Sequence, residues 1–190
     1  MTFNLAFPLP FRAVRRVGIA ACAIAALSAA APVPASADAG TDFLAAISGS
    51  FKGRGVVRES ADKAPENVIC QLTSTLARDG TLLKNSGKCA GAQAKIKVAG
   101  SLGYLANTGQ LTGSLLTTGS QDGTTKSTGK PTGSGATFTT VTFDNRQTVI
   151  ARGKVTITLK GKSSYRLVVS VTEVSSGKTF TAADFTFNRR

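Results

Sequence analysis

Apolar and polar residues alternate in short runs along most of the chain after residue 48. This period of two places successive side chains on opposite faces, which is typical of β-strands with one buried face. Turn residues interrupt the runs roughly every ten positions, as in antiparallel sandwiches and barrels. We therefore predict an all-β antiparallel protein of about eight to ten strands. Besides two hairpins described next, strands are expected at 49–58, 94–99, 110–116, 136–143 and 179–187.

The first predicted hairpin spans residues 70–89, CQLTSTLARDGTLLKNSGKC. A two-residue turn at Asp79-Gly80 places Cys70 directly opposite Cys89. In that register Leu72, Leu76 and Leu83 lie on the same face as both cysteines. The opposite face carries polar residues: Gln71, Thr73, Thr75, Lys84, Ser86 and Lys88. Directly opposed strand residues are close enough for a disulfide, so we predict a Cys70–Cys89 bond.

The second predicted hairpin spans residues 152–172 around a three-residue loop at 161–163. Matching apolar to apolar residues pairs Val155 with Val169 and Ile157 with Leu167. The opposite face of this hairpin is hydroxylated and basic, and its cations form a candidate anion-contact face: Arg152, Lys154, Lys160 and Arg166.

Two further segments differ from this strand pattern. A short helical turn is expected at Thr41–Ile47, with Asp42 as its cap. Residues 119–135, GSQDGTTKSTGKPTGSG, contain almost no apolar side chain. We interpret them as a mobile polar loop, with a projecting hairpin tipped by Asp122-Gly123 as the alternative.

The N-terminus has the composition of a secretory signal peptide. Arg12, Arg15 and Arg16 precede an apolar run from Val17 to Ala31, and Ala35-Ser36-Ala37 forms a small-residue cleavage site. Cleavage between Ala37 and Asp38 would leave residues 38–190 as one barrel-sized domain without a transmembrane segment. We therefore expect a periplasmic or secreted protein, a compartment in which disulfides persist.

The residue types limit the chemistry that we expect. The chain has no histidine, and its 10 acidic residues are scattered without a motif for acid–base catalysis or metal binding. We accordingly predict a protein that is not an enzyme and needs no metal or cofactor.

The net charge of +13 is compatible with a solvated basic surface. It is also compatible with contacts to an acidic polysaccharide or to lipid headgroups through Arg152, Lys154, Lys160 and Arg166. The basic strands lack interleaved aromatic residues, so we expect no nucleic-acid partner.

The start of the first strand, Ser48-Gly49-Ser50-Phe51-Lys52-Gly53, resembles the Gly-x-Trp opening of lipocalins and related calycins, with Phe51 in place of the tryptophan. Arg189 matches the late basic residue that packs on that ring in the family. The resemblance implies an up-and-down barrel that encloses a ligand cavity.

A second resemblance covers residues 38–190. The pattern Phe51-x-Gly53-x-Gly55, then Cys70, then Gly87-x-Cys89 is similar to that of small exported proteins of alphaproteobacteria. This resemblance implies no established activity.

These observations together predict a non-catalytic binding protein of the bacterial cell envelope, with an anionic or small amphipathic ligand. One alternative is an inhibitor of secreted proteases, in which Asp38–Thr41 would act as the inhibitory trunk. Another is a purely structural envelope protein.

Overall fold

The computed structural model describes residues 38–92, 95–118 and 123–190. The predicted signal peptide, which ends at Ala37, lies outside these residues. Within them, one helix precedes ten strands: α1 (Ala39–Ala46), β1 (Gly49–Val57), β2 (Glu66–Leu76), β3 (Leu82–Ala90), β4 (Lys95–Leu105), β5 (Gln110–Thr118), β6 (Gly123–Thr132), β7 (Gly135–Asp144), β8 (Val149–Leu159), β9 (Ser164–Glu173) and β10 (Thr179–Arg189).

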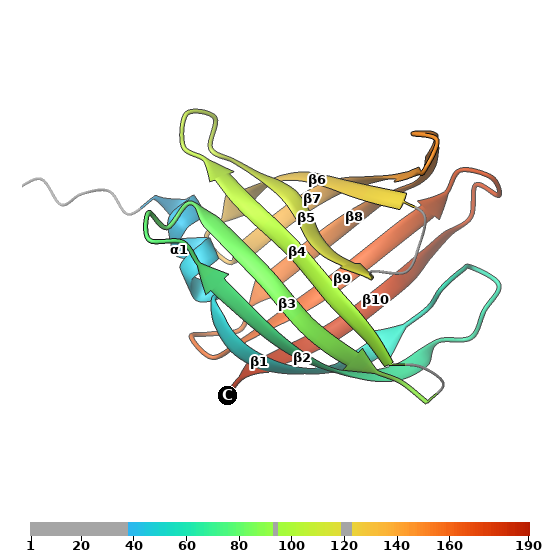
Figure 1. Ribbon diagram of the computed structural model, residues 1–190, viewed down its shortest axis with the longest axis horizontal. Coiled ribbons are helices and arrows are strands. Elements are labelled where there is room, and N and C mark those ends of the chain that lie inside the picture. The colour runs from blue at the N-terminus through green and yellow to red at the C-terminus, as the bar shows by residue number, and fades with distance from the viewer. Residues whose placement is uncertain (1–37, 93–94, 119–122) are drawn as a thin grey trace, which may run out of the picture. The chain divides into compact units, whose positions relative to one another are not determined.

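The strands form a closed antiparallel barrel with up-and-down topology (Figure 1). Each strand pairs with the next in the chain, and β1 pairs with β10 to close the sheet. Closure gives every strand a neighbour on both sides, although β5 and β6 pair over three residues only, 111–113 with 127–129. The predicted all-β barrel is confirmed, and its ten strands lie within the predicted range.

Both predicted hairpin registers are confirmed. Cys70 pairs with Cys89 on β2 and β3, and Val155 pairs with Val169 on β8 and β9. The first turn is longer than the predicted two residues. The Ala77 N–H donates a hydrogen bond to the Leu82 carbonyl, and the Gly80 N–H donates one to the Ala77 carbonyl, so residues 78–81 form the turn. Gly80 has a φ of 73°, a conformation that glycine adopts without strain.

Most of the segment expected to be a mobile loop is a strand. Residues Gly123–Thr132 form β6, and all ten of its positions pair with β7. The interpretation of 119–135 as a loop was therefore wrong for residues 123–132, and residues 133–134 form the turn that leads into β7. β6 pairs with β5 at residues 127–129 only, so the continuous ladder with β7 holds it in the sheet, and backbone pairing of this kind does not require an apolar face.

The predicted helical turn is present, but its cap is different. The Asp38 carboxylate accepts a hydrogen bond from the Gly40 N–H at 3.1 Å and caps α1, so that Asp42 lies in the first turn instead. Among the described residues, no helix is long and apolar enough to cross a membrane.

Candidate ligand-binding site in the barrel

One end of the barrel is closed by α1, which lies at the left in Figure 1. Phe43, Leu44 and Ile47 of this helical segment are buried in the core, and the Phe43 and Phe138 ring centroids are 6.4 Å apart. Packing of this apolar face, and not the short helix itself, holds the segment in place.

Arg189 fastens the same end. Its guanidinium lies 4.8 Å from the Phe51 ring centroid and donates hydrogen bonds to the Ser48 and Ala46 carbonyls, at 2.6 and 3.0 Å. Arg189 thus joins the last strand to the connection between α1 and β1. The structure confirms the predicted packing of this residue on the Phe51 ring.

Large side chains fill the half of the barrel next to α1. Phe51 and Tyr165 pack edge to face at 5.0 Å, and Tyr165 stacks on Phe187 at the same centroid distance. Burial raises the pKa of the Tyr165 hydroxyl, since the phenolate would lose its hydration. The remaining cavity beside Tyr165 has a volume of about 20 Å³ and includes Ser74 and Asn85 in its lining. That space is enough for one water molecule and not for a ligand.

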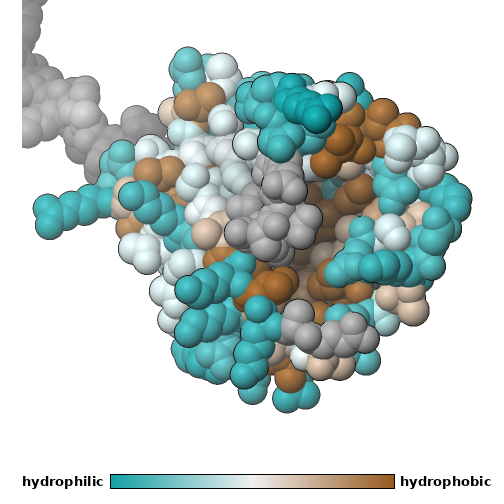
Figure 2. Space-filling model, turned by 45° about the vertical axis from the view of Figure 1, so that its right-hand side comes forward, coloured by the Kyte–Doolittle hydropathy of each residue, from teal (hydrophilic) through white to brown (hydrophobic). Residues whose placement is uncertain are grey.

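The other half of the barrel is lined mainly by small side chains, although Phe180 and Phe185 of β10 also face it and are buried. Its small inward positions follow from the registers, since directly paired residues share a face: Gly55, Val57, Thr125, Thr142, Ala151, Gly153, Val169, Val171 and Ala183. All of them are only partly buried, although they face the inside of a closed sheet. Solvent therefore reaches this part of the barrel, and Figure 2 shows a hollow with hydrophobic side chains inside it.

The inner wall of this open half has a polar side on β6 and β7. The Thr125 and Thr142 hydroxyls are hydrogen bonded at 3.1 Å. Thr140 is buried, and its hydroxyl lies against Gly153, where a β-carbon would be 2.7 Å away. Ser127 is 3% exposed, and its hydroxyl has no hydrogen-bond partner among the described residues. Hydroxyl groups left available in an apolar enclosure favour a ligand with its own hydrogen-bonding group.

The opposite side of the wall is apolar. Val169 and Val171 of β9 lie beside Ala183 and Phe180 of β10, and Val57 of β1 pairs with Ala183. The open half therefore combines hydroxyl groups on one side with aliphatic side chains on the other.

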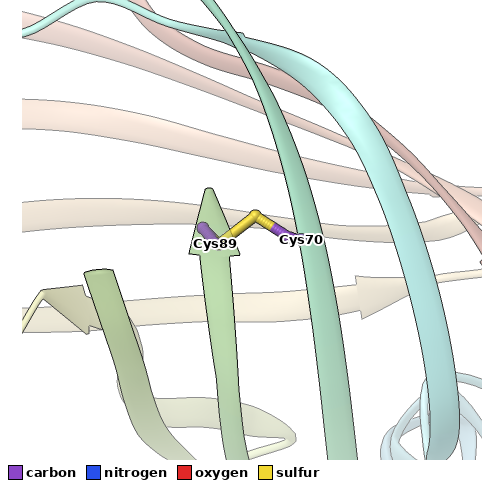
Figure 3. Close-up of a disulfide and its surroundings, with 2 residues drawn as sticks. All are labelled: Cys70 and Cys89. Carbon is purple, nitrogen blue, oxygen red and sulfur yellow. A yellow bond between two sulfur atoms is a disulfide. The ribbon is translucent and has the colours of Figure 1, made fainter. Parts of the chain in front are cut away.

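The Cys70–Cys89 disulfide belongs to the inner face of β2 and β3. Figure 3 shows the two sulfur atoms bonded between these neighbouring strands. Both cysteines are buried, with exposed fractions of 2% and 6%. The predicted disulfide is thus present and lies on the core side of the sheet.

Two loops at the open end are tied together. The Glu173 carboxylate at the end of β9 accepts a hydrogen bond from the Ala61 N–H in the β1–β2 connection, at 3.3 Å. The Lys178 ammonium pairs with Asp62 across the same two loops, at 2.6 Å. These contacts hold one side of the opening in a fixed position.

The charged residues of the described interior lie only at the rim. Glu66 and Glu173 occupy inward positions at the ends of their strands, and the described positions between the rim and α1 carry no charged inward side chain. No group of three metal-binding side chains occurs among the described residues. The interior can therefore offer a ligand apolar contacts and hydroxyl groups, with carboxylates at its entrance.

The four cations of the predicted anion-contact face do not form one cluster. Arg152 and Lys154 lie side by side on the outer face of β8, whereas Lys160 is about 26 Å from Arg152 at the usual rise along a strand. Arg166 donates two hydrogen bonds to Asp184, at 2.9 and 2.6 Å, which neutralises its charge locally.

Sequence reasoning did not single out the hydroxyl groups of β6 and β7. Four of the six residues in 137–142 are threonines, and the strand prediction at 136–143 assigned them no inner face. The register of Phe138, which is fully buried, would have placed Thr140 and Thr142 on the inside.

The closed meander, the helical segment at one end and the Arg189–Phe51 contact define a calycin-like barrel. No protein-family model matches the sequence, and no curated protein matches it.

Solved structures share the fold. The chain is similar to the S-type phycobiliprotein lyase CPES from Guillardia theta, with 14% identity and a TM-score of 0.55 over 78% of this chain and 91% of that chain. It is also similar to Rv2717c from M. tuberculosis, with 13% identity and a TM-score of 0.59 over 80% of this chain and 97% of that chain.

This likeness corrects the expectation that the protein is not an enzyme. A barrel with the same fold is a lyase, so the lack of histidine and of recognisable acid–base motifs does not exclude catalysis. Motif reading missed this because catalytic groups in a barrel come from separate strands and need no sequence signature.

Proposed function

We propose that the open half of the barrel binds a small amphipathic molecule. The observation that carries this proposal is the solvent-accessible inner wall, with aliphatic side chains on β9, β10 and β1 and hydroxyl groups on β6 and β7. A ligand would place its apolar part against Val169 and Val171 and its polar group near Thr140. The solved barrels that share the fold agree with a binding role.

We further propose that the protein is exported and acts in the periplasm or outside the cell, as a component of the bacterial envelope. The disulfide supports this location, since such bonds persist in oxidising compartments. The signal-like N-terminus and the resemblance to small exported alphaproteobacterial proteins agree with it. Mass measurement of protein recovered from the envelope should give a chain that begins at Asp38.

The alternative of a protease inhibitor is less well supported. Its trunk was expected at Asp38–Thr41, but these residues form the cap and first turn of α1. Gly40 is buried beneath the Tyr104 ring, in a place where a β-carbon would collide with that ring. The segment is therefore part of the closed end. A purely structural role gives no reason for partly exposed residues on the inner face of the barrel.

Binding of 11-(dansylamino)undecanoic acid, followed by its fluorescence, tests the interior site. Val169→Trp and Ala183→Phe would fill the open half, and each should weaken binding by about tenfold or more. Val168→Trp is the matched control, because Val168 is the next residue of β9 and faces outward. It should bind the probe as the wild type does.

Thr140→Val tests the polar side of the wall with nearly the same side-chain shape. Loss of one hydrogen bond should weaken binding by about two- to tenfold. Thermal melts of all four variants would establish that they are folded. Equal affinity in the wild type and in both filled variants, or an equal loss with Val168→Trp, would contradict the proposal.

A further inference from the structure

The outer wall formed by β1 to β4 is strongly basic. These four strands lie side by side in the sheet and carry exposed cations on their outward positions: Lys52, Arg54, Lys84, Lys88, Lys95 and Lys97. The outward residues between them are neutral, and none of the described ones is acidic or aromatic. This wall, which we call the basic wall, lies on the opposite side of the sheet from the proposed ligand site.

Two lysines of the basic wall oppose each other directly. Lys88 of β3 pairs in register with Lys97 of β4, and the same row continues through Gln71 to Lys52. Like charges at directly opposed strand positions lower the stability of a sheet. Neither lysine forms an ion pair with a described residue. An anion that contacts both would remove this repulsion.

Lys88 and Lys97 line two adjoining grooves on the surface of the basic wall. One groove has a volume of about 390 Å³ and includes Thr73, Ser86 and Arg190 in its lining. The other has a volume of about 440 Å³ and extends over Ile69 and Lys95. Gln71, Lys88 and Lys97 line both, so the grooves meet at the lysine pair.

We propose that the basic wall binds an acidic polysaccharide. Four strands about 4.8 Å apart give the row from Lys52 to Lys97 a width of about 14 Å, which suits an extended chain with repeated carboxylates. The Thr73 and Ser86 hydroxyls and the Gln71 amide lie between the cations and can hydrogen bond sugar hydroxyls.

Other polyanions fit this wall less well. Nucleic-acid strands are held by aromatic side chains that stack on bases, and the described outward residues here include none. A membrane surface favours several protruding apolar side chains gathered beside the cations. The basic wall exposes three large aliphatic side chains, Val56, Ile69 and Leu105, on three different strands, and only Ile69 lines the grooves. A groove lined by cations, hydroxyls and an amide favours a hydroxyl-rich anionic chain.

Fluorescent polygalacturonate, with neutral dextran as the uncharged polymer, tests this proposal with the chain from residue 38 onward. We expect the wild type to bind polygalacturonate at low salt, to lose affinity as salt rises, and not to bind dextran. Lys88→Glu with Lys97→Glu should weaken binding by about tenfold or more.

The matched control is Arg152→Glu with Lys154→Glu. It makes the same change in net charge on the outer face of β8, which belongs to the anion-contact face predicted from sequence. We expect this control to keep most of the affinity. Binding of 11-(dansylamino)undecanoic acid should be unchanged in both double variants, so that loss of the interior site and loss of the basic wall are distinguishable.

Three results would overturn the proposal. An equal loss in both double variants would show that binding follows net charge and not this wall. Absence of polygalacturonate binding by the folded wild type would reject the ligand class. Binding to phosphatidylglycerol vesicles without binding to polygalacturonate would assign the surface to membranes instead.

Discussion

Breaking the Cys70–Cys89 bond tests how much of the barrel's stability depends on this one link between β2 and β3. The two residues are 19 positions apart, and a loop of that length gives a stabilisation of about 3 kcal/mol in the chain-entropy model. For a domain of this size, that loss corresponds to a fall in Tm of about 6 to 12 °C.

The assay compares thermal and urea unfolding of three forms of the protein. These are the oxidised wild type, the wild type reduced with dithiothreitol, and the variant Cys70→Ala with Cys89→Ala. The reduced wild type keeps both sulfur atoms in the core, so its loss of stability reports the bond without a cavity. The alanine variant should lose somewhat more, because both side chains are buried.

The urea slope gives a second measure. Without the bond the unfolded chain is more expanded, so the dependence of the unfolding free energy on urea should become steeper. If the reduced wild type melts within about 2 °C of the oxidised protein, the bond does not stabilise the barrel through the unfolded chain, and the reasoning is refuted.

Three further predictions concern single contacts. Arg189→Ala should lower the unfolding free energy by about 1 to 2 kcal/mol, because the contact with the Phe51 ring and two hydrogen bonds are lost. Arg189→Lys should lower the unfolding free energy by a smaller amount. Thermal melts that coincide for Arg189→Ala and the wild type would refute this prediction. Gly53→Ala should cost about 1 to 3 kcal/mol because the new methyl group would collide with the buried Phe187 ring, and the cost should shrink in a Phe187→Leu background. The hydrogen bond from Arg166 lowers the pKa of Asp184 in the folded chain, so its stabilisation is present above the ordinary carboxyl pKa and is lost as the pH falls. Asp184→Asn should therefore lose less stability than the wild type between about pH 5 and pH 3, as measured by urea unfolding at each pH.

The hairpins were predictable from sequence because two independent signals agreed in each. The apolar faces and the turn positions gave the same register around Asp79-Gly80 and around Gly161, and the structure has both registers. Neither signal exists in β6. Its inward positions include Thr125, Ser127 and Gly129, and the Phe138 ring of β7 lies over Gly129. The apolar cover of β6 thus comes from its neighbour, which a strand-by-strand reading cannot detect.

The position of the site was hidden for a related reason. Alternation tells which residues face inward, but the depth of each inward residue depends on strand stagger around the whole barrel. Val155 and Val169 are paired on neighbouring strands, yet Val155 is 5% exposed and Val169 is only partly buried. The boundary between the filled and the open half therefore depends on how all ten strands are staggered, which no single strand of the sequence encodes.

The residues that stabilise this barrel and those proposed to bind ligands lie in different places, both along the barrel axis and across the two faces of the sheet. Along its axis, the largest fully buried side chains gather beside α1, and small, partly exposed ones line most of the open half. Across the sheet, β2 and β3 present Cys70 and Cys89 to the inside, and Gln71 and Lys88 to the outside. Because these residues alternate on the same strands, the disulfide also fixes the register that brings Lys88 beside Gln71. One link in the sheet thus supports both the proposed interior site and the arrangement of the basic wall.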